Sequence, residues 1–201
     1  MMIVPIVEGK AEVQSVPELL RRIAHERGIY ETLIGKAFRV HRNKIVKKGE
    51  IERAIKLIRY QRENVRAIII LIDADDDSQE ELGLKLSARA RKVTRLPISV
   101  ILANREFEAW FLAAKESLRG FRGIKKDASA PKNPESIRGA KEELERNMER
   151  GQHYVPVIDQ PAFVKKFDMQ TAQERSKSFA YLIKEFEAII AQIKGVNSQT
   201  S

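Results

Sequence analysis

The chain has 201 residues, is 43% hydrophobic, contains no cysteine and carries a formal net charge of +9. This length is enough for one sizeable core, and the lack of cysteine excludes a disulfide scaffold and a thiolate zinc site. No apolar run approaches the roughly 20 residues that span a bilayer. We therefore expect a soluble, cytoplasmic protein without membrane contact. Its first residues are predicted to form a strand and not a signal peptide.

The first half of the chain alternates between short apolar runs and segments in which apolar residues recur with helical spacing. The pattern predicts strands at residues 3–7, 37–41, 66–72 and 96–102. Helices are predicted over residues 12–27, after Gly49 and after Ser78, which is placed to cap the third helix. This alternation predicts an α/β fold: a Rossmann-like core with a four-stranded, mostly parallel sheet flanked by helices.

After Arg105 the pattern changes to helices separated by loops. It predicts helices over 106–118, 134–150, 163–167 and 178–193, a turn at 169–172 and an irregular loop over 120–134. Asp159 is a candidate N-cap in this region. We therefore divide the chain into an α/β core at 1–115, a helical extension packed on the core at 116–195, and a disordered tail at 196–201.

The third predicted strand is an apolar run that ends in four carboxylates within five positions, Asp73, Asp75, Asp76 and Asp77. Clustered carboxylates repel one another, and a hard divalent cation is the simplest partner that favours such a cluster. Asp73 and Asp75 have the spacing to share one ion, and Mg²⁺ or Mn²⁺ fits best because the available donors are oxygens. The alternative role for Asp73 is to cap the next helix, while Asp76 and Asp77 are predicted to be loop acids.

Further acids follow the first and fourth predicted strands. Glu8 comes directly after the first strand, and Glu106 and Glu108 follow the fourth by a few residues. Because the carboxyl ends of parallel strands meet at one edge of a sheet, where ligands bind, these acids should converge with Asp73. Glu8 is then a candidate general base or acid, or a metal ligand. The alternative for Glu106 and Glu108 is a helix N-terminus, which favours acids.

Basic residues are concentrated in one segment, because residues 36–66 hold eleven Lys and Arg residues and three Glu residues. The loop after the second strand lies on the same sheet edge as the acids and is suited to phosphate contacts. The candidate nucleic-acid-binding residues are Lys10, Arg39, Arg42, Lys44, Lys47, Lys48 and Arg105. The alternative is a solvated basic surface without a ligand.

Two sets of motifs carry a family resemblance. Val7-Glu8-Gly9, followed by Leu71-Ile-Asp73-Ala-Asp75, resembles the Toprim domain of topoisomerases, primases, small ribonucleases and overcoming-lysogenisation-defect nucleases. Asn104-Arg-Glu-Phe-Glu-Ala-Trp-Phe111 and Arg175-Ser-Lys-Ser-Phe179 are similar to segments of a bacterial family of stand-alone Toprim-like proteins of unknown function. The Toprim resemblance implies that Glu8 is catalytic and that Asp73 and Asp75 bind metal. Glu106 and Glu108 match the second family's own segment, which makes Glu108 a further catalytic candidate.

We expect Mg²⁺- or Mn²⁺-dependent cleavage of DNA or RNA, in a bacterial defence or DNA-processing system. The alternative is a non-catalytic module that binds nucleic acid or a protein partner such as an ATPase, as the family resemblance suggests. A phosphatase-like hydrolase with Asp73 as nucleophile is less favoured, because such enzymes usually carry the nucleophile on the first strand. A topoisomerase or a primase would need additional domains.

Overall fold

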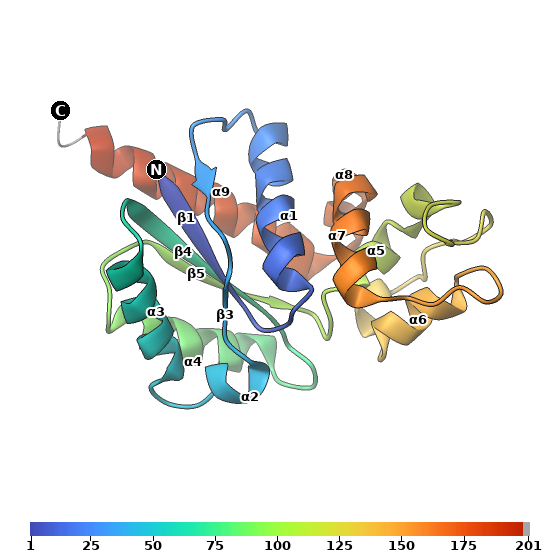
Figure 1. Ribbon diagram of the computed structural model, residues 1–201, viewed down its shortest axis with the longest axis horizontal. Helices are drawn as coiled ribbons and strands as arrows, with labels where there is room; N and C mark the ends of the chain where they lie inside the picture. The colour runs from blue at the N-terminus through green and yellow to red at the C-terminus, as the bar shows by residue number, and fades with distance from the viewer. Residues whose placement is uncertain (199–201) are drawn as a thin grey trace.

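The computed structural model describes residues 1–198 and contains one five-stranded sheet surrounded by helices (Figure 1). The strands are β1 (Met2–Val7), β2 (Leu33–Ile34), β3 (Phe38–Arg39), β4 (Val65–Asp73) and β5 (Ile98–Ala103). The helices are α1 (Glu12–Glu26), α2 (Arg42–Ile45), α3 (Glu50–Gln61), α4 (Gln79–Arg91), α5 (Ala109–Ala113), η1 (Lys115–Leu118), η2 (Pro134–Ser136), α6 (Ala140–Arg146), α7 (Pro156–Lys166), α8 (Met169–Arg175) and α9 (Lys177–Ser198). Within residues 1–198, no helix combines the length and apolar character needed to cross a membrane.

The sheet is parallel, as the alternation of elements predicts. Its strand order is β2-β1-β4-β5. Strand β3 also pairs with β1, as β2 does. Ile70 of β4 lies beside Ile6 of β1 and Val100 of β5. The predicted number of four strands is wrong, because β2 adds a fifth. A two-residue strand has no periodicity that a sequence could reveal.

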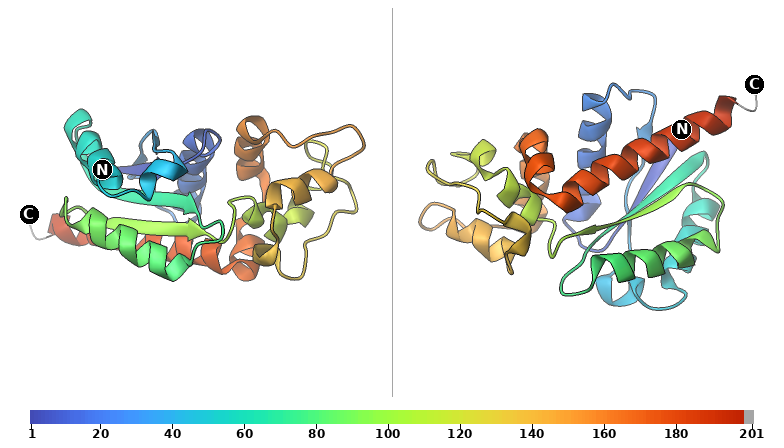
Figure 2. Two further views of the ribbon diagram at one scale, coloured as in Figure 1. Left: turned by 90° about the horizontal axis from the view of Figure 1, so that it is seen from below. Right: turned by 180° about the vertical axis from the view of Figure 1, so that it is seen from behind.

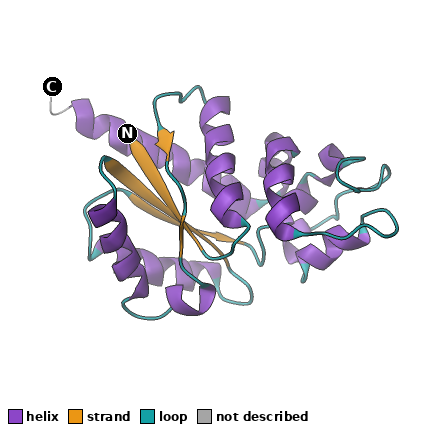
Figure 3. Ribbon diagram, viewed as in Figure 1, coloured by secondary structure: helices purple, strands orange, loops and turns teal. Residues whose placement is uncertain are grey.

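Each face of the sheet is covered by helices (Figures 2 and 3). Residues 67, 69 and 71 of β4 pack in one apolar cluster with α1 and α9, whereas residues 68, 70 and 72 pack in another with α3 and α4. This alternation follows from the two-residue repeat of a strand and explains why β4 is apolar throughout. Helix α9 runs behind the strands in Figure 1 and in front of them in the reversed view of Figure 2.

The chain leaves β1 and β4 in opposite directions. From β1 it passes through α1 on one face to the outer strand β2, and from β4 it passes through α4 on the other face to β5. Ligand sites of open α/β sheets lie where two adjacent strands diverge in this way, beyond their carboxyl ends. Glu8 and Asp73 occupy those two ends.

The helical extension differs from its prediction in the position of its elements. The segment 134–150 forms only η2 and α6, and the predicted helix over 163–167 is the last part of α7, which begins at Pro156. Pro156 suits the first helical position, where a backbone N–H is not needed. Asp159 is therefore not an N-cap but lies in the first turn of α7, where its carboxylate accepts from the backbone N–H of Val155. The predicted turn at 169–172 is the helix α8.

Helix α9 also runs past the predicted start of the disordered tail, because it continues to Ser198. Residues 199–201, the rest of that predicted tail, lie outside the described residues.

Aromatic side chains join the extension to the sheet. Phe111 is fully buried, and its ring packs edge-on against the rings of Phe107, Phe163 and Phe167. The indole N–H of the buried Trp110 donates to Ser178 Oγ at 2.8 Å, at the start of α9. These contacts place segments from α5, α7 and α9 in one core with the sheet.

We predict that Phe111→Ala lowers the free energy of unfolding by about 3–5 kcal/mol, because it removes a large ring from the centre of this core. Equilibrium denaturation in urea measures the change. Tyr60→Ala is the matched control, since Tyr60 is 89% exposed, and it should change stability by less than about 0.5 kcal/mol. Equal effects of the two substitutions would contradict the prediction.

Candidate acidic site at the sheet edge

Glu8 and Asp73 lie side by side at the carboxyl ends of the two central strands. The backbone N–H of Asp73 donates to Glu8 Oε1 at 3.4 Å. Asp73 Oδ1 in turn accepts from the backbone N–H of Phe107 at 2.8 Å, so the loop after β5 covers this carboxylate. Asp73 is 8% exposed. The structure thus brings together the two acids that the strand-end argument placed at one edge.

Two more carboxylates, Glu12 and Glu108, lie in the same region, and we call Glu8, Glu12, Asp73 and Glu108 the acid cluster. Glu12 is in the first turn of α1, and Glu108 directly precedes α5. Both are buried, Glu108 completely. Glu8, Glu12 and Glu108 each have a buried Oε2 atom without a hydrogen-bond partner among the described residues. Buried polar atoms are normally paired, so three unpaired oxygens in one cluster require a positive charge or protons.

Sequence reasoning missed Glu12. An acid in the first turn of a helix is common because the helix dipole favours it there, so Glu12 carried no distinctive signal. Its spacing of four residues from Glu8, across the turn at Gly9, is the one hint that the two carboxylates share a site. A Cβ added to Gly9 would meet the Glu12 carboxylate at 2.1 Å, which shows how closely this side chain folds over the turn.

Burial, followed by the charges of neighbouring acids, raises the pKa values of Glu8, Asp73 and Glu108. Burial is the main reason that the pKa of Glu8 rises from 4.5 to about 7, against the lowering effect of the Arg42 guanidinium. Burial, followed by the charges of Glu108 and Glu8, raises the pKa of Asp73 well above its usual range. The pKa of Glu108 is raised too, again mainly by burial. These three side chains therefore hold protons more tightly than ordinary carboxylates do.

The helical extension supplies uncharged donors to the cluster. The Tyr154 hydroxyl donates to Glu108 Oε1 at 3.0 Å. The Gln160 side-chain amide donates to the same oxygen at 3.2 Å and to Glu12 Oε1 at 3.4 Å. Both donors therefore use the Oε1 atoms, and the Oε2 atoms of Glu12 and Glu108 receive no hydrogen bond from the described residues. Burial and the nearby Glu108 raise the pKa of Tyr154, so its hydroxyl stays protonated.

Lys141 of α6 is the cation on this side of the cluster. Its Nζ lies 3.4 Å from Glu106 Oε2 and 3.7 Å from Glu108 Oε2. Burial opposes its charge, but Glu108, Asp73 and Glu106 together raise the pKa of Lys141. Glu106 Oε1 also accepts from the backbone N–H of Ala140 at 3.0 Å. Glu106 thus anchors α6, while Glu108 belongs to the acid cluster.

Arg42 is the cation on the opposite side. Its Nε lies 3.3 Å from Asp75 Oδ2 and 4.0 Å from Glu8 Oε2, and its Nη2 pairs with Asp77. Asp75 is exposed and has a φ of 51°. The structure therefore places Asp75 against Arg42, whereas Asp73 points into the buried cluster. Arg42 is half-buried and is held by acids, so its predicted role in nucleic-acid binding stays a prediction.

The other predicted phosphate-binding residues have different surroundings. Arg39 Nε donates to the Glu8 carbonyl at 3.1 Å. Arg39 also lines a pocket of about 210 Å³ with Lys44 and Arg53. Arg105 pairs with Asp76 at 2.9 Å. The remaining predicted residues, Lys10, Lys47 and Lys48, have exposed side chains.

The donor chemistry of the cluster suits a hard divalent cation, because it consists of carboxylates and includes no thiolate. Three of its buried oxygens also have no hydrogen-bond partner among the described residues, so they could interact with a positive charge. Within residues 1–198, however, no three Asp, Glu or His side chains are arranged so that they could hold one metal ion. Joint ligation by Glu8, Asp73 and Asp75 would therefore require at least one of these side chains to turn.

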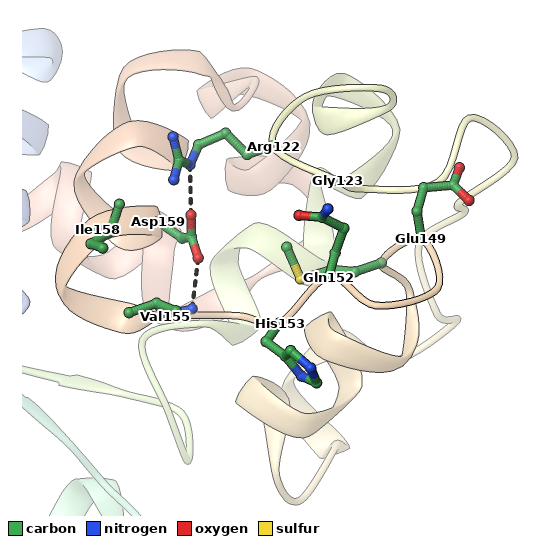
Figure 4. Close-up of a pocket in the computed structure, with 9 residues that line it drawn as sticks. Arg122, Gly123, Glu149, Gln152, His153, Val155, Ile158 and Asp159 are labelled. Carbon is green, nitrogen blue, oxygen red and sulfur yellow. Dashed lines mark hydrogen bonds and ion pairs between the residues drawn. The ribbon is translucent and has the colours of Figure 1, made fainter.

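A separate pocket of about 520 Å³ lies in the extension (Figure 4). Its lining residues are Arg122, Gly123, Met148, Glu149, Gln152, His153, Val155, Ile158 and Asp159. The buried Asp159 spans its wall between Arg122 Nε, at 2.6 Å, and the backbone N–H of Val155. Adjacent residues of α7 thus belong to different sites, since Asp159 lines this pocket and Gln160 contacts the acid cluster.

The pKa of Glu8 gives a prediction for the pH dependence of stability. Because the folded-state value lies above the unfolded one, Glu8 costs no stability below about pH 4.5 and progressively lowers it as the pH rises through about 7. We predict that Glu8→Gln raises the free energy of unfolding at pH 8, by at most about 3 kcal/mol, and leaves it nearly unchanged at pH 4.5. Thermal unfolding in EDTA at both pH values measures this.

Glu63→Gln is the control for that experiment, because Glu63 is an exposed acid outside the cluster. It should have the same small effect at both pH values. A Glu8→Gln variant that is less stable than the original protein at pH 8 would contradict the assignment of Glu8 as a destabilising buried acid.

Comparison with known proteins gives a family but no function. No curated protein and no solved structure matches the chain significantly. The model of a domain of unknown function, DUF4276, matches residues 7–187, a range that includes every member of the acid cluster together with Lys141, Tyr154 and Gln160. The match does not name Toprim, so that resemblance stays a prediction. The chain belongs to the DUF4276 family, whose function is not established.

Proposed function

We propose that this protein is a metal-dependent phosphodiesterase that cleaves nucleic acid, with the acid cluster as its catalytic centre. The observation that carries the proposal is the set of three buried carboxylate oxygens without hydrogen-bond partners, beyond the carboxyl ends of two adjacent parallel strands. Ligands of open α/β sheets bind at this position. Unpaired buried carboxylates are costly in a merely structural role.

The charges of the site favour the binding of a divalent cation. Four carboxylates form the cluster, and Arg42 and Lys141 contact it from opposite sides. Arg42 is shared with Asp75 and Asp77, and Lys141 is shared with Glu106. Each cation is thus partly neutralised by acids outside the cluster. A divalent ion would relieve the repulsion among these carboxylates, which adds to the effect of burial on the pKa values of Glu8, Asp73 and Glu108.

The residues that would hold the ion are Asp73 and Asp75, and Glu8 would serve either as a third ligand or as the group that transfers the proton. When bound, Mg²⁺ or Mn²⁺ would neutralise charge on a phosphodiester and make a water molecule more acidic. Glu8 is the candidate for the proton transfer, because a pKa of about 7 suits a group that exchanges protons near neutral pH. Glu108, held by Tyr154 and Gln160, would contribute fixed negative charge beside Asp73.

A basic surface next to the cluster supports nucleic acid as the substrate class. Arg39, Lys44 and Arg53 line one pocket there. The exposed side chains of Lys47, Lys48, Lys56 and Arg59 follow along the α2–α3 segment. Contacts of Lys and Arg with phosphates supply most of the sequence-independent affinity for nucleic acid. A protein partner such as an ATPase stays a prediction from the family resemblance.

We predict that Mg²⁺ or Mn²⁺ raises the thermal unfolding midpoint of the protein at pH 8 and that EDTA reverses the rise. A metal concentration one hundred times the dissociation constant would raise the free energy of unfolding by about 2.7 kcal/mol. Asp73→Asn should abolish both the shift and the cleavage of plasmid, single-stranded DNA or RNA. Asp127→Asn removes an exposed acid of the extension and should preserve both.

The outcomes separate the two candidate functions. Cleavage that depends on metal and on Asp73 supports the enzyme. No metal-dependent shift, together with no cleavage of any substrate, contradicts it. Nucleic-acid binding that survives both EDTA and Asp73→Asn, without cleavage, would instead support a non-catalytic binding module.

We further predict that Lys44→Glu combined with Arg53→Glu weakens nucleic-acid binding about tenfold or more at low salt, because both side chains line the basic pocket. The slope of log affinity against log salt should fall by about two. Fluorescence anisotropy with a labelled oligonucleotide measures both quantities. The control is Lys165→Glu combined with Lys166→Glu, which makes the same change of charge at the exposed end of α7. Equal losses in the two double variants would contradict a localised interface.

A further inference from the structure

Strand β5 is an outer strand of the sheet whose second edge is open. It pairs with β4 on one side, and no strand within residues 1–198 pairs with its other side. The Pro97 carbonyl accepts from the N–H of Ile68, so the backbone groups of the alternate residues 98, 100 and 102 face away from β4. The Gln79 side chain satisfies the Leu102 carbonyl at 2.8 Å. An open edge of this kind is a template for a further strand.

A groove of about 420 Å³ runs along this edge between α4 and α9. Val100 and Leu102 of β5 form its apolar floor. Leu84 of α4 and Tyr181 of α9 stand on its two sides and are 66% and 45% exposed. Two large exposed side chains beside an unpaired edge are unusual for a surface that only meets water.

Charged residues are distributed along the groove in a regular way. Helices α4 and α9 both run antiparallel to β5, because Gln79 contacts Leu102 at one end of α4 and Glu185 accepts from Ser99 Oγ, at 2.5 Å, well along α9. At the carboxyl end of β5 lie Glu80 on the α4 side and Lys177 on the α9 side. At its amino end Arg91 lines the groove on the α4 side, and Glu185, which is not part of the lining, lies next to Ser99 on the α9 side. Along each of the two helices, the charge at the carboxyl end of β5 is thus opposite in sign to the charge at its amino end.

We propose that this groove is a self-association surface, in which a second copy of the chain pairs its β5 antiparallel to the first across a twofold axis perpendicular to the sheet. That rotation keeps α4 on the same face and reverses its direction. It places Glu80 opposite Arg91 of the partner subunit, and Lys177 opposite Glu185 of the partner subunit. Leu84, near the middle of α4, meets its own counterpart.

The charge pattern is the reason for choosing a second copy as the occupant. A twofold interface uses the same surface on both subunits, so it must be complementary to itself. Reversed signs at the two ends of each helix meet that condition. A partner strand with only acidic or only basic residues would meet a like charge at one end of α4 and at one end of α9. The pairing would also continue the sheet across the two subunits and cover both free edges of β5.

Analytical ultracentrifugation of the full chain tests the proposal, with circular dichroism to confirm that each variant is folded. We expect a concentration-dependent dimer. Leu84→Asp and Glu80→Arg should each raise its dissociation constant about tenfold or more, because each places like charges opposite one another across the twofold axis. Adding Arg91→Glu to Glu80→Arg should restore the dimer. A protein that is monomeric at all concentrations, or a dimer unaffected by both substitutions, overturns the proposal.

Cross-linking distinguishes the antiparallel arrangement from a parallel one, and the absence of native cysteine makes single cysteines specific probes. With a short bismaleimide, Leu84→Cys alone should give a covalent dimer. Tyr60→Cys, exposed on α3 away from the groove, should not. If Leu84→Cys links only when mixed with Tyr181→Cys, α4 faces α9 and the antiparallel arrangement is wrong. None of these measurements depends on the acid cluster, so their outcome is separate from that of the proposed function.

Discussion

Four carboxylates gathered at the junction of two central strands, three of them buried, are the constraint on which much of this structure depends. Carboxylates in a low-dielectric setting need a compensating charge, hydrogen-bond donors or protons. The chain supplies partners from widely separated segments: Arg42 from α2, Lys141 from α6, and Tyr154 and Gln160 from around the start of α7. Even so, three carboxylate oxygens receive no hydrogen bond from the described residues, although Arg42 lies 4.0 Å and Lys141 3.7 Å from two of them. The site is therefore partly compensated, which is the condition expected of a site that receives a further charged ligand.

This constraint gives the extension a role in the site. Although residues 116–195 follow the last strand and could resemble an appendage, they carry Lys141, Tyr154 and Gln160, all of which contact Glu108. The same segments share an apolar core with the sheet through the aromatic rings around Phe111. Helix α9 then returns to cover one sheet face. Apolar packing thus holds the donors in place, and the donors determine which oxygens of the acids stay unpaired.

Strand β5 connects the two proposals. Its carboxyl end leads into the loop whose Phe107 N–H binds Asp73, and its outer edge forms the floor of the groove between α4 and α9. Ser178 links them further, because its Oγ accepts from the backbone N–H of Asn104 and from Trp110. Pairing of two β5 strands would restrain β5, and with it the loop that follows β5 and contacts α9. The proposed dimer thus uses the outer edge of β5, whereas the proposed catalytic site lies beyond its carboxyl end.

The sequence by itself determined the α/β class, the parallel sheet and the meeting of Glu8 with Asp73, because hydrophobic periodicity and the direction of parallel strands follow from local pattern. It also indicated that Glu108 lies near Asp73, although not that it is fully buried. It did not reveal β2, which is too short to show a period, or Glu12, which looks like any acid in a first helical turn. Only the tertiary structure decided which acids share one buried site and which cations face them. Those choices depend on contacts such as Glu12 with Gln160, 148 positions apart, which no local pattern specifies.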